Sequence, residues 1–219
     1  MNFDFDLAVN SFPVLLVGAL VTIKITAISV ALGVVIGLVV GVARISQLKP
    51  LRLLAMAYID FLRGTPLLVQ IFLIYFALPV VSGQRVDPFF AAITACSINS
   101  GAYVAEIFRS GIQSIDKGQM EAGRSLGMTW LQTMWHIILP QAVKRVIPQI
   151  GNEFIALLKD SSLVSVIGFE ELTRSGQLII ARTYGSLEIW PCVAIIYLVM
   201  TLSISQLVAY LERRFRTDD

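Results

Sequence analysis

Amide, phenol and ionisable side chains recur inside stretches of this 219-residue sequence that are otherwise apolar. Asn99, Tyr103 and Glu106 follow one another at spacings of four and three, so one face of a helix presents an amide, a phenol and a carboxylate together. An ionisable group inside a membrane-spanning segment costs roughly 2.5–3.5 kcal/mol to insert, and it therefore faces the interior of a bundle and has a partner there. This face is a candidate lining for a pathway through a membrane.

Other polar residues interrupt the neighbouring apolar stretches. Gly64 and Pro66 flank Thr65, and a helix broken there frees backbone groups that a membrane tolerates only where they are buried or line a cavity. With these included, the candidate pathway residues are Arg63, Thr65, Asn99, Tyr103, Glu106, Glu153, Asp160 and Ser161. In the alternative interpretation the charges form structural ion pairs that lock helices together: Arg63 with Glu106 or Asp60, and Lys159 with Glu153 or Asp160.

The elements that must position these residues are membrane-spanning helices. Hydrophobic residues make up 56% of the chain, charged residues 15%, and the mean hydropathy is +0.77, which would leave a soluble domain with too much apolar surface to cover. A spanning helix needs roughly 20 mostly apolar residues. Five stretches qualify, at residues 14–43, 54–81, 88–108, 146–167 and 189–211. The sequence predicts an all-α integral membrane protein with one domain over residues 1–219.

The distribution of lysine and arginine sets the orientation of these spans. An odd number of spans places the two termini on opposite sides. With the N-terminus outside, the outer segments hold only Arg85, Arg174 and Arg182, whereas the inner segments hold 11 lysines and arginines. We therefore expect a cytoplasmic C-terminus and a cytoplasmic loop at 116–140. The net charge of +2 reflects this orientation and not nucleic-acid binding, which requires a concentrated basic face.

The loop at 116–140 begins with the signals of a short helix. Asp116 is a suitable N-cap, with Gln119 placed to return a hydrogen bond to it. Gly127 can adopt the left-handed conformation that ends a helix, so the first helix is expected from about 117 to 126.

A second helix is expected directly after this glycine turn. Thr129 and Gln132 repeat the capping signal, and apolar residues then recur at helical spacing on one face, namely Leu131, Met134, Trp135 and Ile138. Such a hairpin could simply rest on the bilayer. Glu121 and the small pair Ala122–Gly123 suit docking against a protein surface better than insertion among acyl chains.

Seven residues of the loop form a recognisable pattern: Glu121, Ala122, Gly123, Gly127, Ile137, Leu139 and Pro140. The pattern resembles the EAA loop of the membrane subunits of bacterial ABC importers, with Gly123 in place of the family's usual second alanine, a departure we expect to be sterically mild. Three further segments are similar, in order and spacing, to the polar amino-acid branch of these permeases: RGTPLLVQ from Arg63, NSGAYVAEIFRSGIQSIDKGQ from Asn99 and GNEFIALLKDSSLVSVIG from Gly151.

The resemblance implies a type I ABC importer permease fold in the bacterial inner membrane, with a set of partners. Two permease copies form the translocation path, an extracytoplasmic solute-binding protein delivers the amino acid, and the EAA helix fits a groove on a cytoplasmic ATPase that uses ATP and Mg²⁺. Glu121, Ala122, Gly123 and Gly127 would couple that ATPase to the spans. Basic amino acids and glutamine are the leading substrates. The second permease is either another copy of this chain, which is simpler, or a homologue.

The chain itself carries no signal for a bound cofactor or metal. It lacks the G-x-x-x-x-G-K-[ST] phosphate loop, so ATP is expected on the partner subunit. Two other function classes fit less well, because a membrane enzyme would need a catalytic constellation and a passive channel would need no ATPase-docking helix. Cys96 and Cys192 fall in predicted spans and His136 is the single histidine, so no disulfide or metal site is expected.

Overall fold

The structure, a computed structural model, describes residues 3–215, and every regular element in that range is helical. The elements η1 and η2 are π-helical turns and η3 is a 3-10 helix. In chain order the elements are α1 (Phe5–Ile45), α2 (Lys49–Gly64), α3 (Leu67–Phe72), η1 (Leu73–Ala77), α4 (Leu78–Ser82), α5 (Pro88–Gln113), α6 (Lys117–Ser125), α7 (Trp130–Thr133), η2 (Met134–Ile138), α8 (Leu139–Asp160), η3 (Ser161–Ile167), α9 (Leu172–Thr183) and α10 (Ser186–Phe215).

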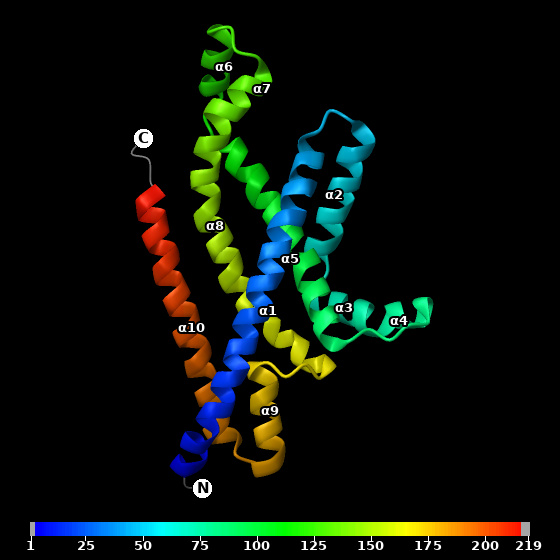
Figure 1. Cartoon of the computed structure of the whole chain (residues 1–219), viewed down its shortest axis with the longest axis vertical. Helices are drawn as coiled ribbons and strands as arrows, with labels where there is room; N and C mark the ends of the chain where they lie inside the picture. Colours follow the sequence, from blue (N-terminus) through cyan, green and yellow to red (C-terminus); the bar gives the residue numbers. More distant parts are fainter. Residues whose placement is uncertain (1–2, 216–219) are drawn as a thin grey trace.

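Helix α1 runs along the long axis of the molecule, and α5, α8 and α10 pack against it (Figure 1). The hairpin of α6 and α7 lies beyond one end of this bundle. Helix α9 lies at the opposite end, near the start of α1, and α3 and α4 project sideways (Figure 1). The candidate pathway residues and the candidate coupling residues therefore lie on connected helices, because α5 and α8 both lead into the hairpin.

Close packing of α1 against α5 depends on glycines spaced by four. A Cβ atom at Gly37 would lie 2.6 Å from Cγ1 of Val104, and one at Gly33 would lie 2.9 Å from Cβ of Ser100. Small residues let helix backbones approach within a membrane, where burial of apolar surface alone gives no driving force. This stripe holds the polar face of α5 at a fixed position against α1.

Two helices of the described part of the chain, α1 and α10, are each long and apolar enough to cross a membrane, and α2 with α3–α4 makes a third if that bent pair is one span. The stretch expected as one span at 54–81 bends by 106° at Thr65–Pro66. Pro66 has no N–H to continue the helix and pushes the preceding residue out of the α conformation, so Thr65 is extended. The break predicted from Gly64 and Pro66 is therefore confirmed.

The remaining two expected spans lie in α5 and α8, which are more polar than α1 and α10. The stretch 88–108 lies within α5, whereas 146–167 covers part of α8 and continues into η3, because the α-helix ends at Asp160. In the described residues α5 and α8 are long enough to cross a membrane but are less apolar than α1 and α10. Their polar side chains are the reason, and these include the side chains that the sequence singled out.

Three apolar clusters stabilise the bundle. The first joins α1, α3, α5, α8 and η3, the second joins α1, α8, α9 and α10, and a small third cluster lies where α5 and α8 meet the hairpin. Cys96 is fully buried in the first cluster and Cys192 borders the second, and both cysteines are free thiols.

Candidate transport and coupling sites

Gln70 closes the helix break between α2 and α3. Its Nε2 donates hydrogen bonds to the carbonyl oxygen of Leu62 at 2.9 Å, and to the carbonyl and hydroxyl oxygens of Thr65 at 3.1 and 3.0 Å. The carbonyl of Leu62 has no helical donor because the residue four positions later is Pro66. Two of the backbone carbonyls at the break are thus hydrogen-bonded inside the protein. Gln70 was missed in the sequence, although a buried glutamine in the apolar run after the break is a visible signal.

Asn99 supports this closure from α5. Its Nδ2 donates to Oε1 of Gln70 at 3.0 Å, and both side chains are buried. The structure therefore brings two predicted residues, Thr65 and Asn99, into one hydrogen-bond network. The amide of Asn99 is engaged by the protein and ties the broken helix to α5.

Arg63 contacts Tyr103 and not Glu106. The guanidinium carbon of Arg63 lies 5.2 Å from the centroid of the Tyr103 ring, a cation–π contact between α2 and α5. Arg63 is exposed, and Tyr103 is 36% exposed. No ion pair within residues 3–215 joins Arg63 to Glu106 or Asp60, so the alternative that pairs Arg63 with Glu106 holds only as a longer-range electrostatic interaction.

Glu106 is held by two other arginines. Its Oε1 accepts hydrogen bonds from Arg109, at 2.8 Å from Nε and also from Nη2, and its Oε2 lies 3.6 Å from Nη1 of Arg44. Arg109 is one turn further along α5, and Arg44 reaches Glu106 because the glycine stripe brings α1 close. Glu106 belongs to a structural ion-pair cluster, so its carboxylate is less available to a solute than the helical spacing suggested.

Two carboxylates of α8 form no ion pair with the cations of residues 3–215. Glu153 is half-buried and Asp160 is exposed, and within residues 3–215 no ion pair joins either of them to Lys159. Glu153 does interact electrostatically with Arg63 and with Asp160. Ser161 is fully buried, and its hydroxyl donates to the carbonyl of Leu158 at 2.8 Å at the end of α8.

Glu171, the N-cap of α9, is a buried carboxylate that sequence reasoning missed. It is 0% exposed and accepts hydrogen bonds from the backbone N–H groups of Thr173 and Arg174, at 2.9 and 2.8 Å. The hydroxyls of Tyr197 on α10 and Thr22 on α1 also donate to it, at 3.0 and 3.4 Å. Burial raises the pKa of the Glu171 carboxyl above its ordinary value, and these four donors oppose that rise. Glu171 thus joins three helices at the end opposite the hairpin.

The hairpin begins and turns as the sequence predicts. Asp116 caps α6 by accepting a hydrogen bond from the N–H of Gly118 at 2.6 Å, and α6 ends one residue earlier than expected, at Ser125. Gly127 has a φ of 82°, in the left-handed region where glycine is favoured. Thr129 and Gln132 form the predicted reciprocal capping box at the start of α7. These local signals are confirmed except for the bond expected from Gln119, because within the described residues α6 has no reciprocal capping box at Asp116.

The expectation that Gly123 is a mild departure from alanine is wrong in this structure. Gly123 is buried against Thr133 of α7, and a Cβ atom at position 123 would lie 2.6 Å from Cγ2 and 2.8 Å from Oγ1 of that threonine. Thr133 is itself 0% exposed, and its hydroxyl donates to the carbonyl of Thr129 at 3.0 Å, so it has little freedom to move. Gly123 lets the two arms of the hairpin touch.

The apolar residues that were expected to share one face after the glycine turn do not all pack together. Met134 and Ile138 join the cluster formed with Ile115 and Ala142, whereas Leu131 is 68% exposed. Residues 134–138 form a π-helical turn, in which Met134 and Ile138 pack inward while Trp135 is 67% exposed. The cluster anchors the hairpin to α5 and α8.

Comparison with known proteins identifies the family of the chain. Residues 33–217 match the family described as "Binding-protein-dependent transport system inner membrane component". The chain belongs to this family. The resemblance to ABC importer permeases seen in the sequence is thereby confirmed.

Several relatives of this inner membrane component match it along its whole length. The glutamine transport system permease protein GlnP of Escherichia coli (strain K12) is 45% identical over 217 residues, 99% of each chain. The arginine transport system permease protein ArtQ of Bacillus subtilis (strain 168) is 39% identical over 219 residues, 100% of each chain. A chain in the crystal structure of an amino acid ABC transporter with histidines is 47% identical, with a TM-score of 0.95 over 98% of this chain and 100% of that chain.

In this inner membrane component the outer face of the hairpin lies open. Glu121, Ala122 and Gly127 are exposed, unlike Gly123 on the inner face.

Residues 123–127 also match the G-x-S-x-G pattern of hydrolases, but Ser125 lies at the end of a helix and its hydroxyl donates to the carbonyl of Glu121 at 2.9 Å. That pattern requires a strand-to-helix turn to expose a nucleophile, so the context needed for hydrolysis is not met.

Proposed function

We propose that the chain is the permease subunit of an ABC importer of polar amino acids. The observation that carries this proposal is the 39–45% identity, over essentially the whole chain, to permeases named for arginine and glutamine transport. These relatives are permease subunits and not enzymes. Hydrolysis of ATP, with Mg²⁺, belongs to a separate ATPase subunit.

The membrane topology of this proposal has five spans. Helices α1 and α10 are two, the bent α2–α4 segment is a third, and α5 and α8 with η3 complete the set. The polar faces of α5 and α8 are tolerated because they face the interior of the bundle or a cavity. The excess of lysine and arginine supports a cytoplasmic hairpin and C-terminus, with the N-terminus outside.

The hairpin is the proposed coupling element. Glu121, Ala122 and Gly127 lie on its open face, where a groove of the ATPase can receive α6. The caps, the contact of Gly123 with Thr133 and the apolar cluster beneath make the hairpin rigid. A rigid lever transmits closure of an ATPase dimer into α5 and α8, which then move as bodies between inward-open and outward-open states.

The proposed substrate pathway follows the open edges of α2, α5 and α8. Glu153 and Asp160 present carboxylates to the ammonium or guanidinium group of an amino acid, and Arg63 beside Tyr103 presents a cation to its carboxylate. Four other predicted residues hold the surrounding helices, namely Thr65, Asn99, Glu106 and Ser161. Basic amino acids and glutamine suit this distribution of charge.

The pathway requires partners on both sides of the membrane. A second copy of the chain completes the path, and an extracytoplasmic solute-binding protein delivers the amino acid. The test is the ATPase activity of the complex of permease, ATPase and binding protein, measured with each amino acid in turn. Stimulation by glutamine or by a basic amino acid supports the proposal, whereas one rate with every amino acid contradicts it.

A further inference from the structure

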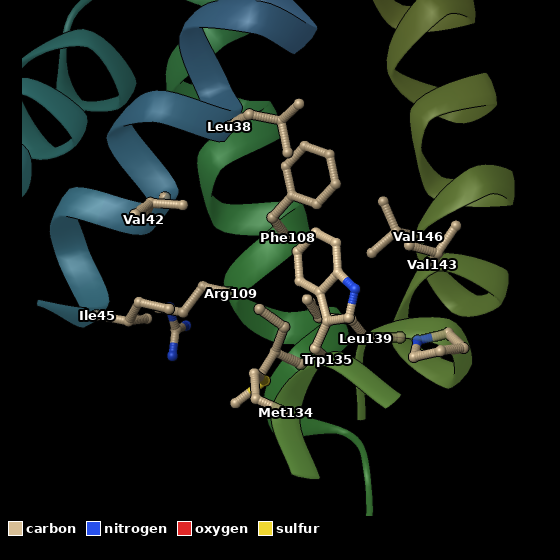
Figure 2. A pocket seen from close by; sticks show the side chains of 14 residues that line it. Leu38, Val42, Ile45, Phe108, Arg109, Met134, Trp135, Leu139, Val143 and Val146 are labelled. Atoms are coloured by element: carbon tan, nitrogen blue, oxygen red, sulfur yellow. The ribbon is translucent and has the colours of Figure 1, made fainter. Parts of the chain in front are cut away.

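An apolar groove with a volume of about 630 Å³ opens between α1 and α8 at the hairpin end of the bundle. Figure 2 shows Phe108 of α5 and Trp135 of η2 inside the groove, between Leu38 and Val42 on one side and Val143 on the other. Trp135 is 67% exposed, so its indole forms part of an open wall and not of the packed core. The lining of the groove suits an apolar group.

One end of this groove is positively charged. Arg109 lines the groove, and Figure 2 places it toward the hairpin end, beside Ile45. Arg109 and Arg44 share the single carboxylate of Glu106, so this cluster of three residues has one net positive charge. Basic side chains at the cytoplasmic ends of grooves between membrane helices attract anionic lipid headgroups, at about a fivefold preference for each charge.

We infer that the groove binds an anionic phospholipid of the cytoplasmic leaflet, with an acyl chain along Phe108 and Trp135 and the headgroup phosphate beside Arg109. The lipid matches both features of the groove, an apolar interior and a cationic end that lies at the membrane surface. A wholly apolar protein helix would match only the apolar interior. The inference rests on the proposed orientation of the permease, which places the hairpin end in the cytoplasm.

The test uses tryptophan quenching by lipids brominated in their acyl chains. A variant with Trp130→Phe and Trp190→Phe keeps only Trp135 and is reconstituted as the full chain in nanodiscs. Zwitterionic lipid is the host, and about 10 mol% of either brominated phosphatidylglycerol or brominated phosphatidylcholine is added. We expect brominated phosphatidylglycerol to quench about one third of the Trp135 emission and brominated phosphatidylcholine about one tenth, as a fivefold preference requires.

Two variants and their controls test the charge. Arg109→Gln should remove the preference for phosphatidylglycerol, whereas Arg52→Gln, the same change on the exposed end of α2, should keep it. Because Arg109 also holds Glu106, Ile45→Glu is a second test that keeps both of these residues and adds a carboxylate beside Arg109. It should remove the preference by repelling the phosphate, and Ile45→Gln should keep it.

Tryptophan at the far end of α10 gives the baseline for ordinary lipid contact. A variant with Trp130→Phe and Trp135→Phe reports on Trp190 alone, and it should be quenched equally by both brominated lipids. Equal quenching of Trp135 by the two lipids would overturn the inference, because it shows ordinary lipid contact. Absence of quenching at Trp135 would also overturn it, because a protein surface then covers the groove. Accessibility of engineered cysteines in the hairpin tests the orientation independently.

Discussion

Replacing Gly123 with alanine tests whether the hairpin works as a rigid unit. The new Cβ atom would lie 2.6 Å from Cγ2 and 2.8 Å from Oγ1 of Thr133, and carbon atoms in contact are ordinarily about 3.5–4.0 Å apart. Thr133 is buried and held by its hydrogen bond to Thr129, so α6 must move away from α7. Overpacking of this kind costs about 1–3 kcal/mol.

A double-mutant cycle assigns this cost to the one contact. Thr133→Ala removes both Cγ2 and Oγ1 and leaves its own Cβ atom 3.2 Å from the Cβ position of an alanine at 123, a tight contact that a small shift relieves. Gly123→Ala should therefore lower the stability of the complex, and Thr133→Ala should recover most of that loss in the double variant. The expected coupling energy between the two sites is about 1–2 kcal/mol.

Two readouts follow the cycle, the Tm of the complex in nanodiscs and the stimulation of its ATPase by amino acid. Gly123→Ala should lower both, and the double variant should restore both. Gly64→Ala is the matched control, since a Cβ atom at Gly64 meets nothing within 4 Å, and it should leave both readouts unchanged. If Gly123→Ala behaves like the control, or if Thr133→Ala recovers nothing, the proposed contact does not stiffen the hairpin.

Three further changes test other parts of the structure. Gln70→Leu leaves the buried carbonyl of Leu62 and the half-buried carbonyl of Thr65 without a donor, at about 1–3 kcal/mol for the buried one, so Tm should fall by several degrees; an unchanged Tm would refute the closure of the break. Glu106→Gln should lower uptake of a cationic and a neutral amino acid by the same factor, and selective loss of the cationic one would place Glu106 in the pathway. Burial raises the pKa of Glu171 above 4.5, so its contribution to stability is present below that pH and is lost as the pH rises through the raised pKa. The Tm of the wild type relative to Glu171→Gln should therefore fall with rising pH, and a constant difference would contradict this.

Local signals in the sequence were sufficient to predict the start and the turn of the hairpin. The cap at Asp116, the left-handed Gly127 and the capping box at Thr129 each depend on residues within a few positions, and all three are present. The helix break at Thr65 was predictable for the same reason, because the neighbouring proline acts through its own ring and missing N–H. Apolar stretches likewise indicated a helical membrane protein.

Partners that come from distant helices were not predictable. Glu106 was correctly placed on a polar face of α5, but its arginine partner on α1 depends on how closely the two helices pack. The roles of Gln70 and Glu171 depend on the same kind of tertiary contact. Gly123 is the clearest example of a contact that the sequence could not predict, because no local pattern indicates that a buried threonine ten residues later touches it.

Coupled transport is tested by uptake of labelled glutamine and arginine into proteoliposomes that contain the permease and its ATPase, with ATP enclosed on the ATPase side and binding protein on the other. We predict that one of these amino acids accumulates and that its accumulation requires ATP. Glu121→Lys, on the open face of the hairpin, should abolish that accumulation while the permease stays inserted. Passage of the amino acid without ATP, or full uptake by the Glu121→Lys variant, would contradict coupling through the hairpin.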